Sequence, residues 1–327
     1  MGKPLASEHS APHVPVLLAE VLAALQPLAG ARIVDGTFGA GGYSRALLEA
    51  GASVVAIDRD PSVAPHVERL RADFPTTFEF IAGEFSVLDQ LVNQPVDGVV
   101  LDIGVSSMQL DKADRGFSFM REGPLDMRMS GEGESAADLV NTLDEDVLAN
   151  LLFAYGEERK SRRIAHSVVA ARAAEPITTT TQLARLIEKA IGRKPGESHP
   201  ATRSFQALRI AVNAEFDQLV EGLFASERLL GEGGRLAVVT FHSLEDRIAK
   251  RFFDPEKGGP AQSRHLPQTA GEAQRWVVAK PAKPTAAEID RNPRARSAIL
   301  RAARRTSAPA REVSYAGLAV PTVRGAA

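Results

Sequence analysis

The sequence of 327 residues contains no cysteine. This absence excludes disulfide frameworks, thiolate zinc sites, iron–sulfur clusters and cysteine nucleophiles, and it fits a reducing compartment. The sequence also lacks any run close to the roughly 20 apolar residues that a membrane span needs. Residues 1–13 contain no apolar stretch of signal-peptide length. We therefore expect a soluble, cytoplasmic protein with no membrane partner.

A large excess of charge of one sign is missing too, because the net charge is only −2 at pH 7. A uniformly basic nucleic-acid-binding protein is excluded, whereas a local basic patch is not. Residues 110–146 carry 4 Lys/Arg against 10 Asp/Glu, residues 147–213 carry 11 against 5, and residues 291–327 carry 8 against 1. This segregation favours basic surface regions, although a solvated helix face is the simpler interpretation of any single charge.

Short apolar runs alternate with helical patterns over the first 110 residues. Near-continuous apolar strands separated by helices are typical of a parallel sheet that is covered on both faces, which is an α/β fold. The strands that we expect here are Arg32–Phe38, Ser53–Asp58, Phe78–Ile81 and Asp97–Ile103.

The next buried strand, Arg235–Phe241, begins more than 130 residues later, although a crossover needs only about a dozen residues. The pattern between them predicts the helices Ser135–Tyr155, Glu157–Ala174, Thr181–Ile191 and Thr202–Leu230. We therefore expect a discontinuous sheet domain of residues 1–109 and 213–327 and an inserted helical domain of residues 110–212. Two late runs, Trp276–Lys280 and Ser297–Arg301, predict two more strands, one of them antiparallel, in a mixed sheet.

A glycine-rich segment, Asp35–Gly42, lies between the first strand and a helix. Such a turn lets the backbone approach a dinucleotide, a phosphate or S-adenosylmethionine closely. No Lys-Ser/Thr follows the glycines, which excludes a phosphate loop, and Ser44 breaks the dinucleotide pattern. Asp35 suits a ligand with a positively charged amino-acid end. A tight turn that binds nothing is the alternative.

Acidic residues end two of the predicted strands. Asp58 ends the second strand, where a carboxylate can accept both ribose hydroxyls of an adenosine, or else cap the next helix. Asp102 ends the fourth strand and is a candidate for ligand contact. His242 follows the fifth strand on the same rim, where a structural role is the commoner one. His9 and His13 have a metal-ligand spacing, but Pro12 and the polar sequence around it argue against a helix that would place both on one face, and we predict no metal site.

Seven separated segments, in this order, closely resemble the MraW family of bacterial small-subunit rRNA methyltransferases. The resemblance covers about His13 to Thr306. Its segments are Asp35–Gly42, Asp58, Asp102–Gln109, Arg115–Arg121 with Pro124–Arg128, His199–Arg203, Phe241–Arg247 and Asn292–Arg296.

The resemblance implies a class I S-adenosylmethionine-dependent methyltransferase, with a Rossmann-like, seven-stranded mixed sheet and an inserted all-helical domain. It implies methylation of N4 of one cytidine in the decoding region of 16S rRNA, within the small ribosomal subunit. The cofactor S-adenosyl-L-methionine would contact Gly41, Gly42, Tyr43, Asp58, Phe85, Asp102 and Gln109. Tyr43 replaces the histidine expected there, and because that contact is made through the backbone the change matters little.

The catalytic requirement is to orient a weakly nucleophilic amine and to accept its proton, and Asp102 is our candidate acceptor. Phe117, Phe119, Met120 and Met127 could stack on an extruded base. Two other functions stay open on the same sheet: a nicotinamide dehydrogenase, and a non-catalytic RNA-binding assembly factor. The oligomeric state is open as well, a homodimer included.

Overall fold

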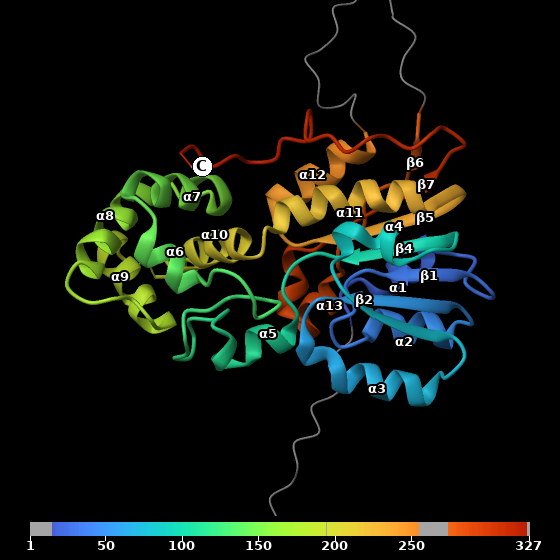
Figure 1. Cartoon of the computed structure of the whole chain (residues 1–327), viewed down its shortest axis with the longest axis horizontal. Coiled ribbons are helices and arrows are strands. Elements are labelled where there is room, and N and C mark those ends of the chain that lie inside the picture. The colour runs from blue at the N-terminus through green and yellow to red at the C-terminus, as the bar shows by residue number, and fades with distance from the viewer. Residues whose placement is uncertain (1–14, 194, 255–273, 326–327) are drawn as a thin grey trace, which may run out of the picture.

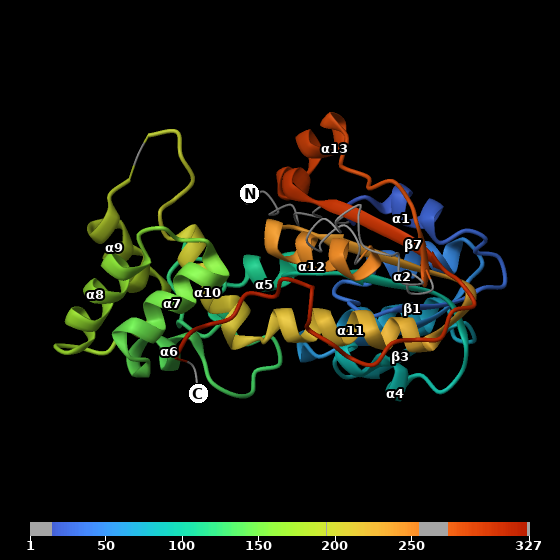
Figure 2. The ribbon, with the colours of Figure 1, turned by 90° about the horizontal axis from the view of Figure 1, so that it is seen from above.

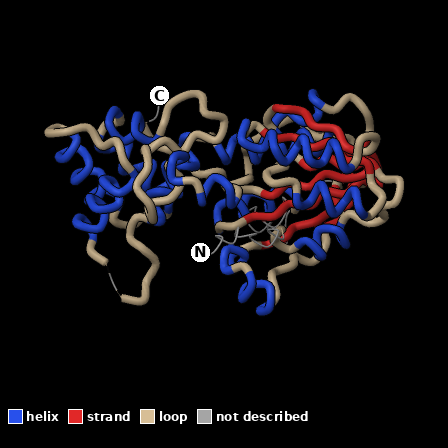
Figure 3. Tube along the Cα trace, turned by 90° about the horizontal axis from the view of Figure 1, so that it is seen from below, coloured by secondary structure: helices blue, strands red, loops and turns tan. Residues whose placement is uncertain are grey.

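The computed structural model describes residues 15–193, 195–254 and 274–325. His9 and His13 lie outside the described residues. The described chain forms a sheet covered by helices and, beside it, a lobe built from helices (Figures 1 and 2). The tube view separates the two parts plainly, because all strands lie on one side of the molecule (Figure 3).

The sheet has seven strands among the described residues, in the order β3-β2-β1-β4-β5-β7-β6. The first five strands of the chain run parallel, whereas β7 is antiparallel to both β5 and β6. The predicted mixed sheet is therefore confirmed. The strands are β1 (Arg32–Asp35), β2 (Ser53–Asp58), β3 (Phe78–Ala82), β4 (Val96–Asp102), β5 (Leu230–Thr240), β6 (Trp276–Val278) and β7 (Ile299–Arg305).

Alternate side chains of the strands enter two different cores. On β2, Val54 and Ala56 belong to one core, and Val55 and Ile57 to the other, as the two-residue period of a strand requires. The first core is covered by α1 (Leu18–Ala24), α2 (Gly42–Glu49) and α3 (Ala64–Asp73), and the second by α4 (Leu88–Leu91), α11 (Glu215–Leu229) and α12 (Ser243–Phe253).

The helical lobe has a third hydrophobic core of its own, which includes Leu148, Ile164, Ile187 and Leu208. Reciprocal capping boxes begin two of its helices, at Ser135 and at Thr179. Its helices are α6 (Ala136–Thr142), α7 (Glu145–Gly156), α8 (Ser161–Arg172), α9 (Thr180–Ile191) and α10 (Thr202–Val212). The boundary at residues 110 and 212 stays a prediction.

Two helices that the sequence predicts as continuous are each broken in two. The pattern over Ser135–Tyr155 is interrupted at Leu143, which is extended (ψ 140°). The pattern over Thr202–Leu230 is interrupted at Ala214, whose φ is +47°. Asn213 precedes it and bonds to the backbone of a distant segment, donating to the carbonyl of Met127 at 2.7 Å. Tertiary contacts thus override the helical periodicity here.

The end of the described chain returns to the helical lobe. Figure 1 shows this segment running past α12 to α7. Asn150 donates a hydrogen bond to the carbonyl of Arg324 at 3.0 Å, and Val323 packs against the lobe core. None of the described helices has both the length and the apolar character needed to cross a membrane.

Candidate functional site

A cavity of about 460 Å³ opens at the carboxyl ends of the parallel strands. Its volume is in the range of small-molecule and cofactor sites, and its place beside β1 and β4, where the strand order reverses, is where open α/β sheets bind ligands. Six of the seven residues expected to contact a cofactor line it: Gly42, Tyr43, Asp58, Phe85, Asp102 and Gln109. The seventh, Gly41, does not line the cavity.

Gly41 instead shapes the turn that enters α2. Its φ is +78°, and a Cβ at this position would lie 2.8 Å from the ring of Phe38. Only glycine meets both conditions without strain. Asp35 also supports the turn from below: it is fully buried, accepts a hydrogen bond from Ser44 Oγ at 2.7 Å and does not line the cavity. Its contact with a positively charged ligand group stays a prediction, and one of its carboxylate oxygens already accepts the bond from Ser44.

Asp58 holds the glycine-rich loop against the end of β2. Its Oδ2 accepts a hydrogen bond from Gly39 N and its Oδ1 accepts one from Asp60 N, both at 2.8 Å. Burial raises the pKa of Asp58, while these two N–H donors lower it. Because a carboxylate has about four acceptor positions, two remain for a ligand. The following helical turn is capped by Asp60, whose Oδ1 accepts from Ser62 N at 2.9 Å.

Asp60 is the centre of a network that the sequence analysis missed. Gln109 Nε2 donates to its Oδ2 at 2.7 Å, and Arg115 Nη1 lies 3.0 Å from the same oxygen. Burial raises the pKa of Asp60, but these partners outweigh burial and lower it overall. Arg115 also donates to the carbonyls of Arg128 and Met129. The side chain of Gln109 thus ties α5 (Ser107–Asp111) and the following connector to the sheet.

Asp102 has a buried oxygen, Oδ1, without a hydrogen-bond partner among the described residues. Burial raises the pKa of Asp102 to about 8, and the charges of Asp35 and Glu245 add to this effect. The backbone N–H of Asp102 donates to Thr37 Oγ1 at 2.7 Å, which fixes the end of β4. Since buried polar atoms are rarely left unpaired, an unpaired oxygen in a cavity wall indicates a ligand-binding role.

The side chains of Tyr43 and Phe85, both expected at the cavity, are held in place by other parts of the protein, one by a hydrogen bond and one by packing. The Tyr43 hydroxyl donates to the carbonyl of Val16, which leaves the backbone of Tyr43 for a ligand. The Phe85 ring lies against α11 at Gly222, where a Cβ would come within 2.4 Å of the ring. Phe85 therefore occupies its place at the cavity because position 222 has no side chain.

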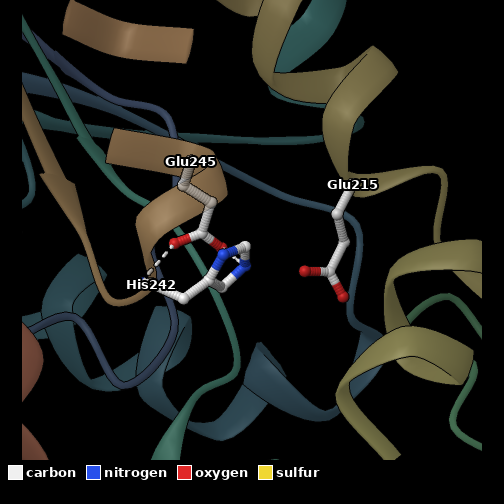
Figure 4. A group of neighbouring side chains, drawn as sticks. All are labelled: Glu215, His242 and Glu245. Carbon is white, nitrogen blue, oxygen red and sulfur yellow. Dashed lines mark hydrogen bonds and ion pairs between the residues drawn. The ribbon is translucent and has the colours of Figure 1, made fainter. Parts of the chain in front are cut away.

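Two carboxylates and an imidazole come together beside the cavity, which Glu215 and His242 line (Figure 4). His242 Nε2 is 2.8 Å from Glu245 Oε1, and Glu215 points toward the same imidazole from α11. The three side chains could hold a metal ion by distance. However, Arg209 donates to both carboxylate oxygens of Glu215, at 2.7 and 2.8 Å, so the group already has a cation. The absence of a required metal stays a prediction.

The connector after α5 forms part of the lobe core. Phe117 and Met127 are 6% and 0% exposed, so their predicted role in a stacking platform is wrong. Phe119 stacks on His199, with ring centroids 4.6 Å apart, and only Met120 is freely exposed, at 79%. Phe117 and Met127 belong to the lobe core, which is why these two side chains are not available to a base.

An open mixed sheet in this order, with a glycine-rich turn after β1 and an acid at the end of β2, is the class I S-adenosylmethionine-dependent methyltransferase fold. A sequence model of the MraW methylase family matches residues 10–306, and the chain belongs to that family.

Curated relatives are similar over nearly their whole length. A protein of Cereibacter sphaeroides is 57% identical over 95% of this chain and 96% of its own. A protein of Chelativorans sp. is 55% identical over 96% of this chain and 93% of its own length. A protein of Azorhizobium caulinodans is 57% identical over 91% of this chain and 88% of its own length. Each is named ribosomal RNA small subunit methyltransferase H. As a methylase of this family the chain takes its methyl group from S-adenosylmethionine, and the nicotinamide alternative no longer stands.

Proposed function

We propose that the protein methylates rRNA of the small ribosomal subunit and that its target atom is the exocyclic N4 of a cytidine in the decoding region of 16S rRNA. The single observation that carries the proposal is the cavity at the strand ends, which is lined by Asp58 and by Asp102 with its unpaired oxygen. The names of the relatives support the rRNA of the small subunit as the substrate. The cytidine and its position follow from the sequence resemblance.

The donor side of the cavity fits S-adenosylmethionine. Asp58 has two acceptor positions left for the ribose hydroxyls. The glycine-rich loop brings backbone close to the cavity at Gly42, and Phe85 offers a ring for the adenine. When bound, S-adenosylmethionine supplies a methyl group on a positively charged sulfonium. Gln109 is bonded to Asp60 through its amide nitrogen, so we propose that it positions the cavity wall rather than reads the cofactor.

Asp102 is the proposed acceptor for the proton of the amine. The lone pair of cytosine N4 is delocalised into the ring, so the amine needs an oriented hydrogen-bond acceptor as it attacks the methyl carbon. The raised pKa of Asp102 keeps the side chain largely protonated at pH 7, and a positive charge brought into the cavity lowers that pKa. The carboxylate then takes one N–H proton as the N–C bond forms and the S–C bond breaks, and releases it to water.

We propose a division of labour between the two parts of the chain. Residues 1–109 and 213–327 form the methyltransferase domain, and residues 110–212 form the inserted substrate-recognition domain. The separate core of the lobe supports this division. Action on ribosomal RNA agrees with the predicted cytoplasmic location. A homodimer stays a prediction that sedimentation of the purified protein tests.

The test is methyl transfer from labelled S-adenosylmethionine to small ribosomal subunits that lack the modification, followed by digestion of the rRNA to nucleosides. We expect the label in N4-methylcytidine, and none of it after Asp102→Asn, although that variant still binds the cofactor in a calorimeter. Label in another nucleoside refutes the N4 assignment. If the wild-type protein binds the cofactor but transfers no methyl group, the assembly-factor alternative is favoured.

A further inference from the structure

A second cavity adjoins the first and shares one wall with it. It measures about 590 Å³ and is more open than the first. Gln206, Phe241 and His242 line both cavities. The second cavity is otherwise lined by residues of α12, by Ser297 and by Ile299, the first residue of β7. A molecule seated there thus has only this wall between itself and the cavity that holds Asp102.

The wall of the second cavity is positively charged. Arg247 and Lys250, both exposed, lie three residues apart on α12. Asp246 lines the cavity too, but its two oxygens accept hydrogen bonds from Arg301 at 2.7 and 2.8 Å. Arg247 is 3.9 Å from Glu157, a contact between half-exposed groups, and Lys250 makes no ion pair with any described residue. Such a wall attracts phosphate groups.

Two residues of the shared wall, Phe241 and His242, contact the same acidic residue. His242 is held by Glu245, which is fully buried and also accepts a hydrogen bond from Phe241 N at 2.9 Å. Burial raises the pKa of Glu245, but His242 and Arg209 outweigh it and lower the pKa overall. The carboxylate therefore holds the imidazole at the start of α12, where its ring also lies 5.9 Å from that of Phe216. Aromatic and imidazole rings are the surfaces on which unpaired bases stack in protein–RNA complexes.

We infer that the second cavity receives the acceptor nucleotide of a single RNA strand. Arg247 and Lys250 hold its flanking phosphates, and its base passes Phe241 and His242 to reach Asp102. This inference rests on the proposed function, because it assumes an RNA acceptor. It explains why an open cavity lined by Arg247 and Lys250 adjoins a cavity whose own charged groups are mostly acidic.

The first experiment removes both cations, with Arg247→Ala and Lys250→Ala combined. Each phosphate contact with a single strand changes the salt slope by about 0.7, which is about fivefold in affinity between 0.1 M and 1 M salt. At 0.1 M salt we therefore expect KM for the small subunit to rise about 25-fold, and the salt slope to fall by about 1.4. Neither kcat nor the affinity for S-adenosylmethionine should change.

The matched control is Arg69→Ala, which removes an exposed cation from α3, at the edge of the sheet far from α12 (Figure 1). It should leave KM unchanged. An unchanged KM and salt slope in the double variant, with normal transfer by the wild type, overturns the inference but not the proposed function. If the wild-type protein transfers no methyl group, the proposed function fails and the inference fails with it.

A second experiment fills the cavity without changing charge. Ser297 is exposed at its edge, so Ser297→Trp can be accommodated without disturbing the core. We expect methyl transfer to fall at least tenfold, while cofactor affinity, which also reports correct folding, stays at the wild-type value. Wild-type transfer by Ser297→Trp would mean that the acceptor enters by another route.

Discussion

Replacing Asp102 by asparagine should stabilise the cofactor-free protein, and more so as the pH rises. The unfolded chain ionises Asp102 near 3.8, whereas burial in the folded protein raises the pKa to about 8. Between these values the folded state holds a proton that the unfolded state has lost. Stability therefore falls as the pH rises, by about 1.4 kcal/mol for each pH unit, and the loss ends near pH 8.

The magnitude follows from the width of that window. From pH 5 to pH 7 the ionisation of Asp102 lowers the wild-type free energy of unfolding by about 3 kcal/mol. Asparagine has the same shape and no charge, so Asp102→Asn lacks this slope. The free energy of unfolding of the variant, relative to wild type, should increase by about 3 kcal/mol over the same range. An unpaired buried amide adds a constant penalty, which does not affect the pH dependence.

Urea denaturation without cofactor measures this difference. The single tryptophan, Trp276, is 2% exposed in the core of the sheet, so its fluorescence reports unfolding of the part of the protein that contains Asp102. Asp114→Asn, at an exposed position, is the control and should show no pH-dependent difference. An equal difference at pH 5 and pH 7 for Asp102→Asn would show that the folded protein ionises Asp102 normally, and the reasoning on its catalytic role would lose its electrostatic basis.

Three further results are expected. The rate of methyl transfer at saturating cofactor should rise with pH and level off no higher than about pH 8, since Asp102 must lose its proton; a rate that falls over pH 6–8 contradicts this. Asp58→Ala should raise the dissociation constant of S-adenosylmethionine at least tenfold, about 1.4 kcal/mol, in a calorimeter, and an unchanged constant would refute the ribose assignment. Arg115→Met should lower the free energy of unfolding at pH 7 by about 3 kcal/mol, because it leaves the buried carboxylate of Asp60 without its cation. The part of this deficit that comes from Asp60 should vanish in acid, as the pH falls through the lowered pKa of Asp60. The part that comes from the lost bonds to the carbonyls of Arg128 and Met129 should remain; a deficit that does not shrink in acid would contradict the role of the charge pair.

The fold could be predicted from the sequence because its signals are local. A buried parallel strand is recognisable from a short apolar run within four to seven residues, and glycines or an acid at its end lie next to it in the chain. Because parallel strands end at one edge, Asp58 and Asp102 could be assigned to the same cavity without any knowledge of side-chain contacts. Local patterning also favoured an inserted helical region, since no strand signal occurs over its length.

What only the tertiary structure decided depends on partners that are distant in the chain. Gln109 bonds to Asp60 from 49 residues away, and Asn213 bonds to Met127 from 86 residues away. The first contact engages the side-chain amide of an expected cofactor ligand, and is the basis of our proposal that Gln109 positions the cavity wall. The second lies at the break in a helix that its own periodicity would continue. A hydrogen bond to a buried group is worth more than the small preference of one residue for a helix or a loop. Periodicity therefore located the strands, and long-range hydrogen bonds determined how the site is built between them.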